Sequence, residues 1–426
     1  MPRLPRDAWV VLGGDALSAV GSGLTLPFLF VYLTRVRGIE LGIAGLAVST
    51  VAVAAIVGNP LSGWLSDRVG ARETLMLGLV VAAVGCVLIA MVREPWQAFV
   101  ATGVEGFGAA IIWPSQDALL AGLVGPGRRS EVFSVRFATL NAGFGVGALV
   151  AAGIVDVSRP GTFVFIYLVD AASFLAFVPV LLTIRVPKQR SEDATAERGG
   201  YRQILRDRVF LRLWVLTALL VAVGYGQYHS GFPGYATRPG GITVRALGVA
   251  FAANTFAVVL AQLFVLRALS GRRRTRAIAL VALAWACAWG ITLIGGALGR
   301  GTDAVVAFAA AMVVFAVGET MLSPALSPMV NDLAPDRLRG HYNGLSTLAW
   351  TTGFMIGPAV AGVVLGTGTP GLLFLGLIGG CAVVALGALR LERHLTPAAN
   401  RIGGAAERGE EAGPAKAQLL PLGEEP

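Results

Sequence analysis

Four acidic residues interrupt long apolar stretches of the sequence: Asp15, Glu105, Asp170 and Glu319. A charged side chain at the centre of a membrane helix costs at least about 2.5 kcal/mol, so such residues usually serve a function. A poorly solvated carboxyl group favours its protonated form and can exchange a proton for a substrate near neutral pH. We expect Glu319 first, then Asp15 and Glu105, to couple protons or bind substrate; structural hydrogen bonds between helices are the alternative. For Asp170 the structural role is the expectation.

Two of these carboxylates precede a proline in corresponding stretches of the two halves of the chain. Glu105 stands nine residues before Pro114, and Glu319 stands five residues before Pro324. The difference of four residues is about one helical turn. This spacing predicts that the two carboxylates lie on equivalent faces of equivalent helices.

Aromatic and polar side chains in the same stretches would suit a large amphipathic organic substrate. They are Trp113, Gln116, Tyr225, Gln227, Tyr228, His229 and Trp350. Anchoring at the membrane interface is the alternative for each Trp and Tyr. The three histidines and three cysteines are scattered, so the sequence predicts neither a metal site nor a disulfide. It also contains no G-x-x-x-x-G-K-[ST] loop, so we expect no ATP hydrolysis by a P-loop and no cofactor.

The composition indicates the solvent in which these residues act. Of 426 residues, 55% are hydrophobic and 14% are charged, against about 25% charged in a soluble domain. This excludes a secreted disulfide scaffold, a disordered protein, a coiled coil and a soluble enzyme with a small core. The net charge of +9 lies in short breaks between apolar runs, which favours a lipid bilayer over nucleic acid as the partner. The excess of Arg over Lys suggests a bacterial genome rich in G and C.

The apolar runs set the number of membrane spans. A helix needs about 20 residues to cross the hydrocarbon core, and the first run carries Asp15 and is too long for a signal peptide. Twelve runs have the required length: 8–34, 40–63, 73–92, 96–124, 132–156, 161–184, 208–232, 243–267, 275–298, 303–331, 341–366 and 370–391.

The positive charges predict the orientation of these spans. When the basic residues inside the runs are counted with the segments beside them, the side of the two termini holds 27 basic residues and the opposite side holds 7. Positive residues are retained on the cytoplasmic side. We therefore expect both termini in the cytoplasm and the chain in the inner membrane of a bacterium.

The chain divides into two similar halves. Gly143 and Gly147 in the fifth run recur as Gly353 and Gly357 in the eleventh, at an offset of 210. Regular recurrence of this kind indicates an internal repeat. We predict four parts: a six-helix bundle at 1–184, a cytoplasmic linker at 185–207, a second six-helix bundle at 208–391 and a disordered cytoplasmic tail at 392–426.

The loop after the second run carries a family motif. The segment Gly63-Trp64-Leu65-Ser66-Asp67-Arg68-Val69-Gly70-Ala71-Arg72 resembles the G-x-L-x-D-R-x-G-x-R/K signature of the major facilitator superfamily. The resemblance covers residues 8–391. It implies an all-α membrane fold of twelve helices in two pseudo-symmetric bundles, which rock to expose a central cavity to each side in turn.

The residue types of this loop have physical roles of their own. Gly63 and Gly70 allow close packing and a tight turn. Asp67 can accept hydrogen bonds from the start of the eleventh helix, near His341, as a latch. Arg68 and Arg72 can pair with carboxylates or lipid headgroups. We treat these residues as a gating motif.

The eleventh run also resembles the glycine and proline motif that exporters of this superfamily carry in helix five. Gly353, Gly357 and Pro358 supply it; the fifth run has Ala148 at the proline position, so plain helix packing remains the alternative. The segment around Gly318 and Glu319 looks like helix ten of multidrug efflux members. We predict a monomeric, proton-coupled exporter of small organic molecules and not an enzyme. A proton-coupled importer of sugars or other small solutes is the main alternative, and a polytopic enzyme or receptor is a remote one.

Overall fold

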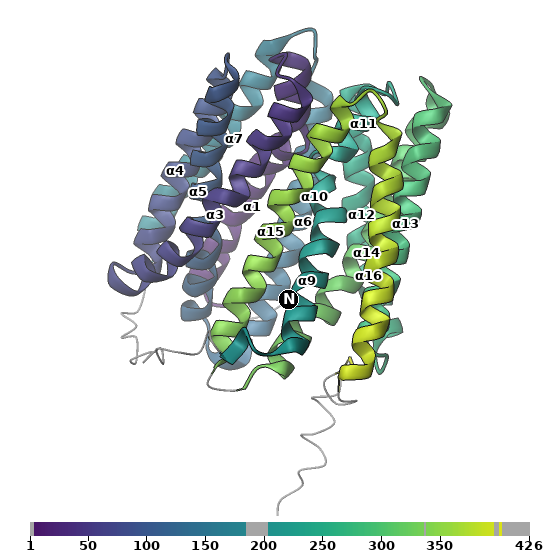
Figure 1. Cartoon of the computed structure of the whole chain (residues 1–426). Helices are drawn as coiled ribbons and strands as arrows, with labels where there is room; N and C mark the ends of the chain where they lie inside the picture. The colour runs from purple at the N-terminus through teal and green to yellow at the C-terminus, as the bar shows by residue number, and fades with distance from the viewer. Residues whose placement is uncertain (1–3, 185–202, 336–337, 396–399, 403–426) are drawn as a thin grey trace, which may run out of the picture.

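The protein is a bundle of long helices that run in roughly one direction (Figure 1). The computed structural model describes residues 4–184, 203–335, 338–395 and 400–402. The helices of the first half are α1 (Arg6–Thr25), α2 (Leu29–Val31), α3 (Leu41–Arg68), α4 (Ala71–Met91), α5 (Pro95–Leu123), α6 (Arg129–Ile154) and α7 (Pro160–Leu182). Those of the second half are α9 (Arg208–Val223), α10 (Tyr225–Tyr228), α11 (Gly231–Thr237), α12 (Val244–Leu269), α13 (Arg274–Leu298), α14 (Thr302–Leu333), α15 (Arg339–Gly366) and α16 (Gly371–Leu391).

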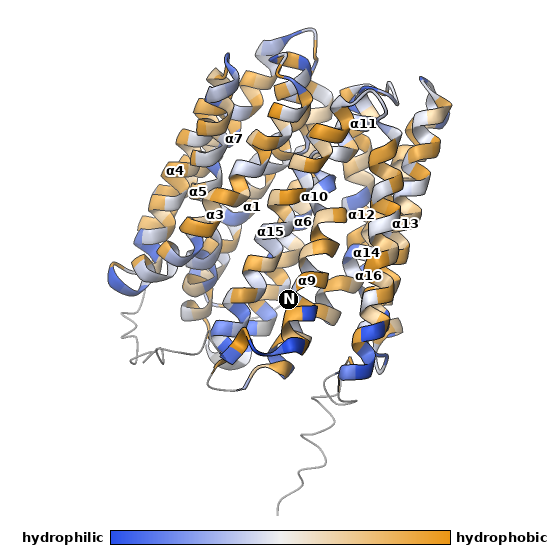
Figure 2. Cartoon of the chain, viewed as in Figure 1, coloured by the Kyte–Doolittle hydropathy of each residue, from blue (hydrophilic) through white to orange (hydrophobic). Residues whose placement is uncertain are grey.

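The helices have the length and apolar surface that a membrane requires. Among the described residues, 11 helical segments are long and apolar enough to cross one. The segment α5, which the sequence predicts as the fourth of twelve spans, has 29 residues and packs beside α3 and α4, but it is not one of the 11. Apolar residues cover the outside of the bundle, and polar ones gather near its ends (Figure 2). Phe264 on α12, for example, has 73% of its surface exposed.

The first and seventh spans are interrupted helices. After α1, a 3₁₀ turn with Pro27 and a π turn at Tyr32–Val36 continue the same span. The seventh span is divided into α9, α10 and α11 at Gly224 and Ser230. Interrupted helices free backbone groups for other contacts, and in membrane proteins they usually line a cavity or pack against other helices.

Part of the predicted disordered tail is ordered. Residues Glu392–His394 form a 3₁₀ turn, and the Glu392 carboxylate is paired with Arg276 at 3.1 Å and also with Arg273. The side chain of Asn400 accepts a hydrogen bond from the backbone N–H of Thr275 at 3.0 Å. The expectation of disorder is therefore wrong for the described residues of the tail, because ion pairs and hydrogen bonds join them to the start of α13. Most of the predicted linker and the rest of the tail lie outside the described residues.

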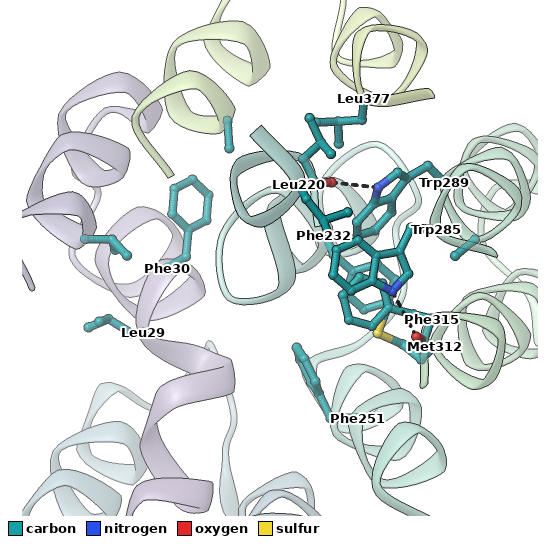
Figure 3. Packing of buried hydrophobic residues seen from close by; sticks show 14 of the residues in the cluster. Leu29, Phe30, Leu220, Phe232, Phe251, Trp285, Trp289, Met312, Phe315 and Leu377 are labelled. Atoms are coloured by element: carbon teal, nitrogen blue, oxygen red, sulfur yellow. Dashed lines mark hydrogen bonds between the residues drawn. The ribbon is translucent and has the colours of Figure 1, made fainter. Parts of the chain in front are cut away.

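Two indole rings form the centre of the core of the second half (Figure 3). Trp285 and Trp289 on α13 are fully buried. The Trp285 ring stacks on Phe315 of α14 with centroids 4.7 Å apart. Its Nε1 donates a hydrogen bond to the Phe315 carbonyl at 3.1 Å, and the Trp289 Nε1 donates one to the Val223 carbonyl at 2.8 Å. Buried indoles need such acceptors, and these two tie α13 to α14 and α9.

The two halves meet closely at the end of the bundle opposite to the start of α1 and the end of α16. There α3 lies against α15, and a Cβ added to Gly45 would lie 2.4 Å from the carbonyl oxygen of Pro358. On the other side α12 lies against α6, and a Cβ added to Gly248 would lie 2.4 Å from the Ala152 Cβ. We call this end the closed end.

Hydrogen bonds also cross the seam at the closed end. Arg35 Nη1 donates to the carbonyl of Thr237 at 2.6 Å, and Arg238 Nη2 donates to the carbonyl of Thr34 at 2.9 Å. The dipeptide Thr34-Arg35 recurs as Thr237-Arg238, 203 residues later in the sequence. Each half therefore supplies one threonine carbonyl and one arginine to the contact. The contact is reciprocal and follows the internal repeat.

Candidate functional site

A small cavity lies at the contact of the two halves and contains Glu319. Its volume is about 190 Å³. The aromatic rings of Tyr225 and Trp350 line it, with centroids 5.7 Å apart, and Phe137 of the first half is also a lining residue. The remaining lining residues are Val258, Gln262, Thr320, Leu322, Leu326 and Ser327. A carboxyl group surrounded by aromatic and amide side chains can bind a proton or an amphipathic cation.

A chain of polar side chains leads to the Glu319 carboxyl group. Tyr228 donates a hydrogen bond to the Asn254 Oδ1 at 3.0 Å, and the Asn254 Nδ2 lies 3.4 Å from the Glu319 Oε2. Tyr225 and Glu319 line the same cavity. In the part of the chain that the structure describes, no salt bridge involves Glu319. A carboxylate in this position is costly unless a cation or proton joins it.

Asp15 lies in a different environment, beside a buried arginine. Arg136 Nε is 3.1 Å from the Asp15 Oδ2, and Arg136 Nη1 is 2.5 Å from the Asp117 Oδ1. The guanidinium lies over the Trp113 ring, 4.9 Å from its centroid, and its Nη2 is 3.4 Å from the Gln116 Oε1. Asp15 is thus part of an ion-paired cluster, and two predicted substrate residues, Trp113 and Gln116, belong to this cluster.

Three residues of these two polar groups were not predicted from the sequence: Arg136, Asp117 and Asn254. Arg136 and Asp117 lie inside the predicted spans 132–156 and 96–124. The sequence does contain a signal for the first two. An arginine or an aspartate inside a membrane span has the same free-energy cost of burial as the four acidic residues considered above. A search for intramembrane charges of both signs would have found the pair.

Glu105 lies away from the Glu319 cavity, near Asp170. A Cβ added to Gly85 of α4 would lie 2.4 Å from the Glu105 Cα, so α5 presses closely against α4 at this point. The Asp170 Oδ2 accepts a hydrogen bond from Thr25 at 2.6 Å, and the Cys86 Sγ is 3.6 Å away. Glu105 interacts electrostatically with Asp170. Both carboxyl groups thus lie within the first half of the molecule.

The prediction that Glu105 and Glu319 occupy equivalent faces is wrong. At the offset of 210 that relates Pro114 to Pro324, the counterpart of Glu105 is Phe315. Phe315 packs against α13, just as Glu105 packs against α4. Four residues advance an α-helix by about 6 Å and turn it by about 40° beyond a full turn. That rotation turns Glu319 toward α12 and the seam and leaves Glu105 inside its own half.

Gln227 also lies outside the Glu319 cavity as the structure describes it. Its side chain is buried, and Nε2 donates to the carbonyls of Ala222 at 2.9 Å and Gly357 at 3.1 Å. Gln227 therefore satisfies backbone groups where the seventh span is interrupted. Tyr225 and Trp350 are the predicted substrate residues that line the cavity.

The family motif forms the turn between α3 and α4. Gly70 has φ +110°, a conformation that strains other residues. A Cβ added to Gly63 would meet no heavy atom within 4 Å. The close packing expected at Gly63 is absent here, because Gly63 lies on an open side of α3. The adjoining Ser62 is buried instead and donates a hydrogen bond to the Ile111 carbonyl of α5 at 2.9 Å.

The two arginines of the motif contact neighbours in the sequence, and Arg72 Nη1 also donates a hydrogen bond to the distant carbonyl of Ile184 at 3.1 Å. Arg72 Nη2 lies 2.6 Å from the Glu73 Oε1, and the Arg68 guanidinium lies over the Trp64 ring at 4.5 Å. The Asp67 side chain is exposed. Among the hydrogen bonds and ion pairs of the described residues, none joins Asp67 to α15, so the predicted latch is not engaged in this conformation.

The paired glycines lie where helices of one half touch. In each half they bring the fifth helix against the first: α6 against α1, and α15 against the α9–α10 segment. In the first half, a Cβ added to Gly143 would lie 2.7 Å from the Ala19 Cβ, and one added to Gly147 would lie 2.2 Å from the Val20 carbonyl oxygen. In the second half, a Cβ added to Gly353 would lie 2.5 Å from the Val221 Cβ, and one added to Gly357 would lie 2.6 Å from the Gly226 Cα. Pro358, next to Gly357, is buried within α15.

Comparison with known proteins agrees with this architecture. The family model described as Major Facilitator Superfamily matches residues 11–299 and 232–422. A Na(+), Li(+), K(+)/H(+) antiporter of Planococcus maritimus is 26% identical over 385 residues, which are 83% of this chain and 88% of the relative. The quinolone resistance protein NorA of Staphylococcus aureus (strain MRSA252) is 23% identical over 369 residues, 84% of this chain and 90% of the relative.

Solved structures show the same fold. The nucleoside transporter NupG superposes with a TM-score of 0.74 at 16% identity, over 91% of this chain and 99% of that chain. The inward open conformation of the xylose transporter XylE from E. coli gives 0.68 at 15% identity, over 91% and 96%. With its apolar spans, its two related halves and a family match along most of its length, this chain belongs to the major facilitator superfamily of membrane transporters.

Proposed function

We propose that the protein is a proton-coupled secondary transporter that exports amphipathic organic compounds, with Glu319 as the group that exchanges a proton for substrate. The observation that carries this proposal is the position of Glu319. Its carboxyl group lies in a cavity that both halves line, between aromatic side chains and without a salt bridge in the described structure. Relatives that are named for quinolone resistance and for cation/proton antiport support the assignment.

The exchange follows from the cost of an isolated carboxylate. When no substrate is bound, a proton neutralises Glu319. A cationic amphipathic molecule can replace that proton, because it supplies the positive charge itself and stacks on Tyr225 and Trp350. Rocking of the two halves then exposes the site to the other side of the membrane.

The orientation proposed for the molecule places the closed end outside. The segments at the opposite end carry most of the basic residues, which favours a cytoplasmic location for that end and for both termini. The conformation is then inward-facing. In this view Asp67 engages the start of α15 only after the cytoplasmic end has closed, and this agrees with its exposure here.

Proteoliposomes with a pH-sensitive dye inside test the proposal, with norfloxacin as the quinolone probe. In the wild-type protein, a norfloxacin gradient should move protons in the opposite direction. Glu319→Gln keeps the side-chain volume and mimics the protonated form. This variant should equilibrate norfloxacin and move no protons.

The matched control is Asp303→Asn, an exposed carboxylate at the start of the same helix. It should retain full coupling. Normal proton movement in Glu319→Gln would make Glu319 a structural residue and shift the assignment to Asp15 or Glu105. Absence of flux for every compound under every ion gradient would favour a membrane enzyme or receptor.

The antiporter from Planococcus maritimus raises exchange of alkali cations for protons as a second candidate function. The described residues contain no group of three His, Cys, Asp or Glu side chains that could hold a metal ion. A sodium gradient applied to the same liposomes separates the two functions. Sodium-driven proton movement that Glu319→Gln removes, without any response to norfloxacin, would favour the second.

A further inference from the structure

A second and larger cavity lies at the closed end, on the seam between the two halves. Its volume is about 980 Å³, at the upper end of the usual range for small-ligand sites. Both halves line it: residues of the α6–α7 connection face residues of the α11–α12 connection and the start of α14. None of these residues belongs to the Glu319 cavity.

The cavity collects most of the positive charge at this end of the molecule. Five arginines line it, with a single aspartate, Asp156. The arginines are Arg35 and Arg159 of the first half and Arg238, Arg245 and Arg300 of the second. Only seven basic residues occur at this end, in the connections and the helix ends beside them. Positive residues are disfavoured in the outer connections of a membrane protein, so their concentration around one cavity calls for a reason beyond topology.

Like charges lie close together here. Arg35 and Arg238 donate across the seam to backbone carbonyls, and each guanidinium has five N–H donors, so both keep donors for another acceptor. Partial burial and the neighbouring charge of Arg35 lower the pKa of Arg238. Such crowding is unfavourable until an anion neutralises it.

Asp156 offsets only part of this charge. Its Oδ1 accepts hydrogen bonds from the Ser158 backbone at 2.9 Å and from the Ser158 hydroxyl at 2.7 Å. These bonds hold the pKa of Asp156 below its usual value. Its carboxylate also lies 3.8 Å from Arg159 Nε. One carboxylate faces five guanidinium groups, and the cavity stays strongly positive.

We propose that this cavity binds an anionic phosphate group, presented either by a soluble solute or by a lipid headgroup. Guanidinium groups recognise phosphate through paired, charge-assisted hydrogen bonds. Because each half supplies arginines, a bound phosphate bridges the seam and stabilises the conformation with this end closed. The inference rests on the cavity and its charges and is independent of the role proposed for Glu319.

Titration of the purified full-length protein in neutral detergent with inorganic pyrophosphate tests the site. The test variant is Arg159→Gln with Arg300→Gln, which leaves the seam arginines Arg35 and Arg238 in place. The matched control is Arg93→Gln, an exposed arginine at the same end that does not line the cavity. By calorimetry at constant ionic strength, the double variant should bind pyrophosphate about tenfold more weakly or worse, and the control should bind like the wild type.

Nanodiscs distinguish the two sources of phosphate. In phosphatidylcholine discs the wild type should bind pyrophosphate as in detergent. If pyrophosphate binds more weakly in phosphatidylglycerol discs than in phosphatidylcholine discs, the lipid competes for the site, and the natural ligand is a lipid headgroup. If the two affinities are equal, the site is still supported, and its ligand is a soluble anion. If the double variant does not fold, the two single variants take its place in the titration. Absence of saturable binding to the wild type, or equal affinities of the charge-deficient variants and Arg93→Gln, would overturn the proposal.

Discussion

Arg136 is a single residue that joins three helices of the first half. It projects from α6, and its guanidinium reaches Asp15 on α1 and Asp117 on α5. The side chain is only 6% exposed. Burial of one charge of such a pair without its partner is far more costly than burial of the pair. Arg136 therefore stabilises the buried carboxylate of Asp15 in the folded protein, independently of any role of Asp15 in proton transfer.

The variant Arg136→Gln tests this dependence. It should lower the free energy of unfolding by about 3–5 kcal/mol, because both carboxylates lose their cation. Addition of Asp15→Asn should restore part of the loss. Chemical unfolding in detergent measures both, and Arg212→Gln, an exposed arginine on α9, should change stability by no more than about 0.5 kcal/mol. If the single and the double variant lose the same free energy of unfolding, the loss comes from the packing of Arg136 on Trp113 and not from the unpaired carboxylates.

At the scale of elements, glycines determine how closely α6 approaches α1. At Gly147 the backbone of α1 occupies the space of a side chain, since an added Cβ would lie 2.2 Å from the carbonyl oxygen of Val20. The corresponding position in the second half, Gly357, packs in the same way on Gly226. Small residues drive helix association in membranes by permitting this approach.

Gly147→Ala should therefore force α1 and α6 apart. We expect a loss of about 1–3 kcal/mol in the free energy of unfolding, typical of an overpacked interior. Gly153→Ala is the matched control on the same helix, because an added Cβ there meets nothing within 4 Å. The control should leave stability unchanged or raise it by up to about 1 kcal/mol. Equal effects of the two substitutions would show that backbone conformation, and not helix contact, accounts for the result.

For the whole molecule, the proposed rocking of the two halves depends on the seam at the closed end. Gly45 and Gly362 allow α3 and α15 to touch, while Arg35 and Arg238 exchange hydrogen bonds with the opposite half. All these contacts lie at one end, so the two halves can rock about the seam without loss of their own cores. A change at the seam should shift the conformational equilibrium and leave each half folded.

Gly45→Ala tests this expectation. A methyl group 2.4 Å from the Pro358 oxygen should disfavour the closed end, and about 1.4 kcal/mol would change the population ratio tenfold. Spin labels at residues 93 and 303, one in each half at this end, would report a longer distance by pulsed electron resonance. Gly42→Ala, where an added Cβ meets nothing within 4 Å, should leave the distances unchanged. The idea fails if both variants give the wild-type distribution.

Several features could be predicted from the sequence alone because each depends on local properties. The low share of charged residues and the long apolar runs require a membrane, since a span must satisfy its own backbone and offer apolar side chains to lipid. The loop at Gly63–Arg72 identified the family from residues adjacent in the chain, and Gly70 has the positive φ that such a turn demands. The offset of 210 between the paired glycines indicated two related halves.

Only the tertiary structure decided which ionisable groups meet. Periodicity gives the spacing of residues along one helix but not the rotation of that helix against its neighbours, and a turn of about 40° separates Glu319 from the counterpart of Glu105. For the same reason the sequence did not reveal that Arg136 pairs with Asp15 or that five arginines from four separate connections line one cavity. Asp15 and Arg136 are 121 positions apart in the sequence, and the cavity arginines come from both halves of the chain. The packing of the helices, which no local pattern records, brings them together.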